Sequence, residues 1–152
     1  MEVLDTGSGD FEVLRERWIR NSDAFILVYN IASRASFRGV EGYYNQIRNE
    51  HSSKPIMLVG NKSDIEEREV SEEEGAKLAD KWGCRFLEAS AKYNSNVLDA
   101  FHKVGELSIE MHGNIEHNKV EGNNVEYSNA EPWIALWKRM WPLSVCWGRR
   151  GK

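Results

Sequence analysis

The sequence has only two cysteines, Cys84 and Cys146, and three prolines among its 152 residues. The two cysteines form neither a metal-binding spacing nor a disulfide framework, which favours a reducing, cytosolic compartment. No signal peptide opens the chain. The longest apolar run, Ala24 to Tyr29, is far too short to cross a bilayer. We therefore expect neither a disulfide-rich secreted protein nor a membrane-spanning one.

Charge is distributed unevenly along the chain. Residues 1–112 carry 14 basic and 20 acidic side chains, a net charge of −6, whereas residues 113–152 carry 6 and 4, a net charge of +2. An acidic body argues against nucleic-acid binding as the main task. The hydrophobic fraction of 41% and the charged fraction of 29% fit one soluble domain.

Apolar runs alternate along the chain with segments of helical period. Strands are expected at Glu2–Asp5, Ala24–Asn30, Ile56–Gly60 and Arg85–Ala89, and helices at Asp10–Asn21, Ser33 to about His51, Ser71–Gly83 and Asn96–Met111. The strands at Ala24 and Ile56 are apolar throughout rather than alternating, which is typical of strands covered on both faces. This order predicts a doubly wound, mostly parallel α/β sheet with right-handed crossovers, in which Arg85–Ala89 is the last strand.

An Asn61-Lys62-Ser63-Asp64 loop follows the expected strand Ile56–Gly60. Such a loop can read a guanine base, because the Asp64 carboxylate can accept hydrogen bonds from both the ring N–H and the exocyclic amine. Adenine offers no such pair of donors and would leave a buried acceptor unpaired. Asn61 can brace the loop or the base, and the aliphatic stem of Lys62 can lie over the ring. The alternative is an ordinary polar surface turn.

A second loop, Ser90-Ala91-Lys92, begins 26 residues beyond Asp64. This distance accommodates one crossover helix and one return strand, so both loops are expected at the same carboxyl edge of the sheet, where open α/β folds bind ligands. A backbone N–H near Ala91 could then donate to the guanine carbonyl, while Ser90 or Lys92 stabilises the loop.

Together these motifs resemble the small GTPases of the Ras subfamily, most of all the Ras proteins of fungi. The resemblance covers roughly residues 2–112 in family order and spacing. It is carried by Leu4 to Gly7, Leu14 to Arg20, Ala24 to Asn30, Ser33 to Phe37, Pro55 to Asp64 and Glu88 to Lys92.

This resemblance implies a small G domain with the P-loop NTPase fold, GTP and GDP as ligands, and Mg²⁺ as the metal. It implies water-mediated contact of Asp5 with Mg²⁺ and contact of the Gly7 N–H with a γ-phosphate. By the same resemblance the protein would be a monomer that hydrolyses GTP in intracellular signalling. Exchange factors, GTPase-activating proteins and effectors would be its partners, and the inner face of the plasma membrane its location.

The chain departs from the family at its front. No G-x-x-x-x-G-K-[ST] phosphate loop occurs, the first switch with its Mg²⁺-binding Thr is absent, and Ser8 stands where the family has the glutamine that orients water. We therefore expect an amino-terminally truncated G domain. The family's phosphate-loop strand lies between the strands matching Glu2–Asp5 and Ala24–Asn30. Its loss is expected to leave both edges unpaired and the chain poorly stable.

The sequence after residue 112 falls outside the resemblance. Residues 113–131 are expected to be a polar linker, and residues 132–152 a basic tail rich in tryptophan, with Trp133, Trp137 and Trp141 at helical spacing. The family's terminal prenylation box is absent. Three interpretations stay open: residues from a misread exon or frame, a segment that binds a membrane surface with Cys146 as an acylation site, and a partner-binding helix.

The sequence is compatible with three functions. The first is a Ras-like guanine-nucleotide switch, present here as a fragment. The second is a non-catalytic Ras-like interaction module that has lost nucleotide hydrolysis, which Ser8 and the missing phosphate loop favour. The third is an unrelated flavodoxin-like α/β domain, which the ordered series of motifs disfavours.

Overall fold

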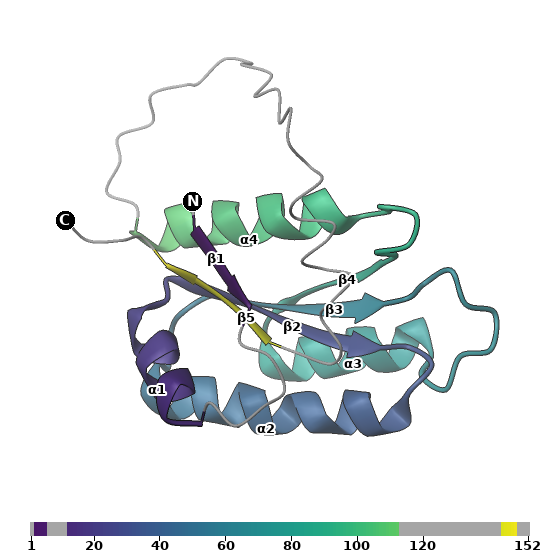
Figure 1. Cartoon of the computed structure of the whole chain (residues 1–152), viewed down its shortest axis with the longest axis horizontal. Coiled ribbons are helices and arrows are strands. Elements are labelled where there is room, and N and C mark those ends of the chain that lie inside the picture. The colour runs from purple at the N-terminus through teal and green to yellow at the C-terminus, as the bar shows by residue number, and fades with distance from the viewer. Residues whose placement is uncertain (1, 6–11, 113–143, 149–152) are drawn as a thin grey trace, which may run out of the picture.

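The computed structural model describes residues 2–5, 12–112 and 144–148, with side chains described for residues 17–111. One five-stranded sheet runs through these residues, with strand order β1-β5-β2-β3-β4 (Figure 1). The elements in chain order are β1 (Glu2–Asp5), α1 (Glu12–Asn21), β2 (Ala24–Asn30), α2 (Arg34–Glu50), β3 (Ile56–Asn61), α3 (Glu72–Trp82), β4 (Arg85–Ala89), α4 (Val97–His112) and β5 (Ser144–Gly148).

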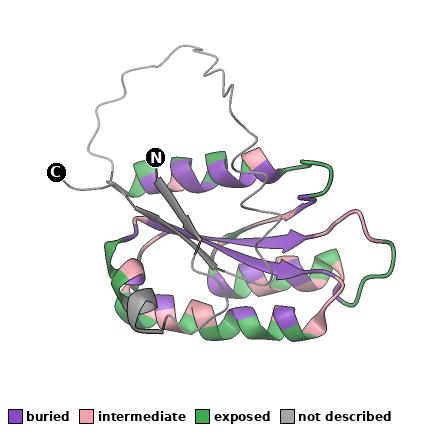
Figure 2. Ribbon diagram, in the orientation of Figure 1, coloured by how far each residue is buried: buried purple, intermediate pink, exposed green. Residues whose placement is uncertain are grey.

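The centre of the sheet consists of the parallel strands β2, β3 and β4. Val28 pairs with Val59, and Val59 pairs in turn with Leu87. Every residue of β2 and β3 is buried (Figure 2), as the uniformly apolar runs predicted. The expected doubly wound α/β fold is confirmed, because helices cover both faces of these parallel strands (Figure 1).

Alternate residues of β2 supply two separate cores. Ala24, Ile26 and Val28 pack in the cluster on the α4 face, together with Val97, Ala100 and Phe101. Phe25, Leu27 and Tyr29 pack on the other face against α2 and α3, with Val40, Ile47 and Trp82 among their neighbours. Both faces of the sheet are therefore apolar, which fixes the register of its central strands.

Local signals set the helix ends. Ser71 and Glu74 form the predicted capping box at the start of α3. Gly83 ends that helix with a φ of 62°, a left-handed conformation that glycine adopts without the steric cost of a Cβ. In the described part of the chain, no helix combines the length and apolar character needed to cross a bilayer.

The strand β5 corrects the expectation of an open gap in the sheet. Ser144–Gly148 lies between β1 and β2 and runs antiparallel to both, so that Val145 pairs with Asp5 on one side and with Ile26 on the other. The prediction that Arg85–Ala89 is the last strand was wrong, as was the premise of unpaired edges on β1 and β2. Backbone N–H and C=O groups at a strand edge need partners, and β5 provides them. The helical spacing noted around Trp133 to Trp141, and the linker before it, lie outside the described residues.

Tyr29 is fully buried between two close-packed glycines. A Cβ added to Gly60 would lie 3.0 Å from the Tyr29 hydroxyl oxygen, and one added to Gly75 would lie 2.4 Å from it and 2.6 Å from the Phe86 ring. Burial is the main cause that raises the pKa of Tyr29 far above its ordinary value, so the phenol stays neutral. The missing side chains of Gly60 and Gly75 therefore make room for the tyrosine that β2 presents to α3.

We expect Gly75→Ala to lower the free energy of unfolding by about 1–3 kcal/mol, because the new methyl group overlaps the buried Tyr29 hydroxyl and the partly buried Phe86 ring. Gly42→Ala is the matched control. It lies inside α2 with nothing within 4 Å of the added Cβ, and it should instead raise stability by about 0.5–1 kcal/mol. Urea denaturation followed by circular dichroism measures both. Equal effects of the two substitutions would contradict this packing.

Candidate functional site

Two loops meet at the carboxyl edge of the parallel strands, one after β3 and one after β4. Asn61, the last residue of β3, pairs with Ala89, the last residue of β4. Just beyond, the Ser63 N–H donates to the Ala89 carbonyl at 3.0 Å. The Asn61–Asp64 loop and the Ser90–Lys92 loop therefore lie side by side, as their spacing predicted.

Asn61 ties the two loops together. Its side-chain Oδ1 accepts hydrogen bonds from the Lys62 N–H at 2.8 Å and from the Ala91 N–H at 3.2 Å. Asn61 is only 7% exposed, and the Ala91 N–H that it accepts is buried with it, so that donor has little access to water in its place. The structure thus uses Asn61 as a brace. The Ala91 N–H, which the sequence suggested for a base carbonyl, is engaged with this brace.

The Asp64 carboxylate is held in place by the second loop. The Ser90 hydroxyl donates to Asp64 Oδ1 at 2.5 Å and accepts from the Tyr93 N–H at 3.3 Å. Lys92 Nζ lies 4.0 Å from Asp64 Oδ2, with the Lys92 side chain 68% exposed and that of Asp64 13% exposed. Asp64 is therefore a well-oriented acceptor, and its Oδ2 retains hydrogen-bonding capacity.

Each loop has a distinctive backbone feature. Lys62 has a φ of 70°, a left-handed conformation that costs a non-glycine residue about 1–2 kcal/mol. In the second loop, Ser90 and Ser95 exchange two backbone hydrogen bonds of 3.0 Å. Strained backbone of the kind seen at Lys62 is concentrated at functional sites, where surrounding contacts maintain it.

Lys92 carries its charge beside Asp64 and Tyr93. Its ammonium lies 4.8 Å from the centre of the Tyr93 ring. A hydrogen bond with Tyr93, and to a smaller degree the Asp64 carboxylate, raises the pKa of Lys92 above its ordinary value. Lys92 therefore keeps its positive charge at neutral pH.

Three supporting residues were missed by the sequence analysis. Arg68 donates to both carboxylate oxygens of Glu88, at 3.2 and 2.9 Å, and so ties the chain beyond Asp64 to β4. Asn96 donates through Nδ2 to the Glu88 carbonyl at 2.8 Å. Glu88 was the only signal in the sequence, and a single glutamate does not reveal which residues will bind it.

The remaining predicted site residues cannot be placed with these. Asp5 is the last residue of β1 and lies opposite Val145, but its side chain is outside the described residues, as are Gly7 and Ser8. Within the described residues, no three His, Cys, Asp or Glu side chains gather as a metal site would require. The assignment of Asp5 to Mg²⁺ stays a prediction.

We expect Asn61→Ala to lower the free energy of unfolding by about 2 kcal/mol, because two partly or fully buried N–H groups lose their acceptor. Asn45→Ala, at an exposed position in α2, is the control and should change stability by less than about 0.5 kcal/mol. Thermal and urea unfolding report both values. A loss no larger than that of the control would argue against the bracing role.

The sequence of the chain is similar to those of a known protein family. The Ras family matches residues 1–110 of the chain. Protein ras-2 of Neurospora crassa is 43% identical over 127 residues, which cover 68% of this chain and 56% of that protein. Ras-like protein B of Aspergillus fumigatus is 44% identical over 131 residues, covering 68% and 55%.

A third relative matches a larger share of the chain. Circularly permutated Ras protein 2 of Dictyostelium discoideum is 40% identical over 125 residues, which cover 79% of this chain and 3% of that much longer protein. The chain spans about half the length of the fungal relatives that it matches.

Proposed function

This chain belongs to the Ras family, and on that premise we propose that its two adjoining loops bind the base of a guanine nucleotide. The observation that carries the proposal is the Asp64 carboxylate, mostly buried and oriented by Ser90, next to a backbone that Asn61 fixes. Such an acceptor selects a partner with two parallel donors.

Guanine matches this acceptor and adenine does not. Its ring N–H and exocyclic amine can donate to the two oxygens of Asp64. Oδ1 can accept one of these bonds while keeping its bond from Ser90, because a carboxylate oxygen has two lone pairs. Adenine at the same place would leave the carboxylate desolvated and unpaired, a loss large enough to reject it by several orders of magnitude.

The remaining residues of the site shape and support the base pocket. Asn61 holds both loops, and we assign the Ala91 N–H to that same support. The aliphatic stem of Lys62 covers one face of the base, and Lys92 balances the charge of Asp64.

In this proposal the guanine nucleotide is GTP or GDP, and the protein acts as a switch in intracellular signalling. By family membership the proposal also includes hydrolysis of GTP, with Mg²⁺ held by Asp5 through water and the Gly7 N–H in contact with a γ-phosphate. Its partners would be exchange factors, GTPase-activating proteins and effectors. Its location would be the inner face of the plasma membrane. A second candidate, a non-catalytic interaction module, is favoured by Ser8, which stands where the family has the glutamine that orients water.

The test is a titration of the full chain with fluorescent GDP and fluorescent ADP in the presence of Mg²⁺. We expect saturable binding of the guanine analogue and at least about 100-fold weaker binding of the adenine analogue, because the preference resides in the base site. Unlabelled guanosine should compete and adenosine should not. Equal affinity for both analogues, or binding of neither, would leave the interaction module as the better account.

A further inference from the structure

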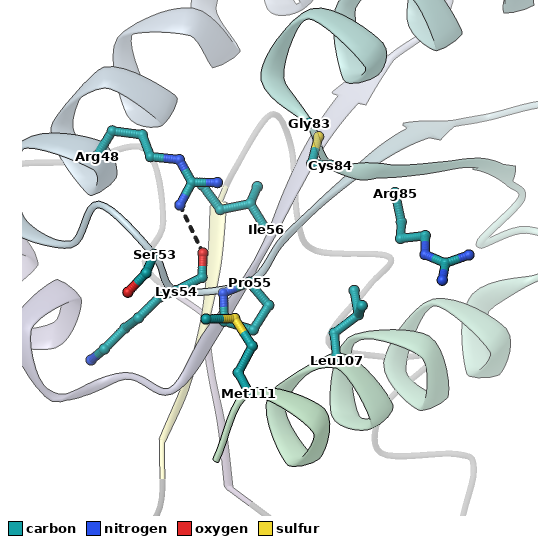
Figure 3. Close-up of a pocket in the computed structure, with 10 residues that line it drawn as sticks. All are labelled: Arg48, Ser53, Lys54, Pro55, Ile56, Gly83, Cys84, Arg85, Leu107 and Met111. Carbon is teal, nitrogen blue, oxygen red and sulfur yellow. Dashed lines mark hydrogen bonds between the residues drawn. The ribbon is translucent and has the colours of Figure 1, made fainter. Parts of the chain in front are cut away.

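A pocket lies at the opposite end of the parallel strands from the two base loops. It has a volume of about 300 Å³ and lies where β3 and β4 begin, whereas the base loops follow the ends of these strands. Ser53 to Ile56 form one part of its wall, Gly83 to Arg85 another, and the last turns of α4 a third (Figure 3). This volume is at the small end of the range for sites that bind small molecules.

One side of the pocket is apolar. Pro55 and Ile56 line it from the start of β3, and Leu107 and Met111 line it from α4 (Figure 3). Met111 is 52% exposed, one of the few large apolar side chains so open to solvent in the described chain. A flexible methionine at the mouth of a pocket can adapt to ligands of varied shape.

The polar side of the pocket is cationic. Arg48, Lys54 and Arg85 line it, and none of the described residues that line it is acidic, although residues 1–112 carry a net charge of −6. The Lys54 ammonium is bound to the carbonyls of Ser22 and Arg20. The guanidinium groups of Arg48 and Arg85 are therefore the cations that could pair with an anionic ligand.

The two arginines differ in how firmly they are held. Arg48 donates to the Lys54 carbonyl at 2.8 Å and to the Ser52 carbonyl at 3.3 Å, and its guanidinium lies 5.2 Å from the centre of the Tyr44 ring. Arg85 approaches from β4 on the other side (Figure 3). Its side chain makes no ion pair or hydrogen bond with any other described residue. One fixed and one unengaged guanidinium therefore flank an apolar wall.

We propose that this pocket binds a small amphiphilic anion, whose carboxylate or phosphate head pairs with Arg85 and whose hydrocarbon tail packs on Ile56, Leu107 and Met111. A guanidinium matches either head group, because both present two oxygens to its planar fork. This site is independent of the proposed base site, with which it shares no residue.

Cys84 gives the pocket a built-in reporter. Its side chain lines the pocket, and burial raises the pKa of the Cys84 thiol to about 11. At neutral pH the thiol is protonated and reacts slowly with alkylating reagents. A ligand in the pocket should slow this reaction further, and peptide mapping by mass spectrometry distinguishes Cys84 from Cys146.

The test measures Cys84 alkylation at pH 8.5 in the full chain against rising concentrations of octanoate and octyl phosphate, with 1-octanol and octylamine as uncharged and cationic controls. At least one anion should protect Cys84 in a saturable way, and the controls should protect at least about tenfold less effectively. If octanoate binds more tightly, the ligand class is the carboxylic acids. If octyl phosphate binds more tightly, the ligand carries a phosphate head group.

Arg85→Gln should weaken protection by about tenfold or more, because it removes the charged donor. Arg38→Gln is the matched control, an exposed arginine on α2 that does not line the pocket, and it should leave protection unchanged. The amide spectrum of each variant shows whether it is folded. Equal protection by octylamine, no protection by either anion, or unaltered protection in a folded Arg85→Gln variant would overturn the proposal.

Discussion

Replacing Asp64 with asparagine is expected to turn the base preference from guanine toward xanthine. The Asp64 carboxylate can only accept hydrogen bonds, whereas an asparagine amide accepts through one atom and donates through the other. Xanthine carries a carbonyl where guanine carries its amine, so the new donor matches xanthine and opposes the guanine amine. We expect the ratio of the guanine to the xanthine affinity to fall by about two to four orders of magnitude.

This selectivity is measured by competition of GDP, XDP and ADP against a fluorescent nucleotide, with wild type and variant side by side. The substitution keeps the size of the side chain and the acceptor for the Ser90 hydroxyl, so the loops should keep their conformation. Asp80→Asn, at an exposed position on α3, removes the same charge away from the site and should leave the selectivity unchanged. An unaltered order of the three nucleotides in the Asp64 variant would remove the basis for base recognition.

The second large effect is expected where β5 closes the sheet. Val145 lies between Asp5 and Ile26, so β5 is an interior strand and its backbone pairs on both sides. Proline at this position removes an N–H and does not fit the interior of a sheet. We expect Val145→Pro to lower the free energy of unfolding by about 3 kcal/mol or more and to promote aggregation through the exposed edge of β2.

Urea denaturation and size-exclusion chromatography measure the two consequences. Val145→Ile is the control, because it keeps both the N–H and the branching at Cβ that favours strands. Its stability should stay close to that of the wild type. If the proline variant unfolds at the same urea concentration as the wild type and remains monomeric, β5 does not support the sheet.

Local sequence predicted the central fold because local signals and tertiary packing agree there. The runs that became β2 and β3 are apolar at every position, and the structure buries every one of their residues. The Ser71 capping box and Gly83 fixed the two ends of α3 to within a residue. The meeting of Asn61 with Ala91 followed from strand order alone, since parallel strands deliver their following loops to one edge.

The strand β5 could not be predicted in the same way. Ser144 to Gly148 is short and follows a stretch where tryptophans at helical spacing are the stronger signal. Its partners, β1 and β2, lie more than a hundred residues earlier, and pairing over such distances depends on the tertiary context rather than on propensity. The Arg68–Glu88 pair was missed for a related reason, because ion pairs across a loop leave no periodic pattern.

The most direct test of the base site follows backbone amide resonances of the full chain during titration with GDP. We predict that the amides of Lys62 and Asp64 in the first loop and of Ala91 and Lys92 in the second shift together, with one common dissociation constant, while equal concentrations of ADP leave them unchanged. Shifts confined to one loop, shifts located elsewhere, or the same response to ADP would contradict recognition of guanine by the paired loops.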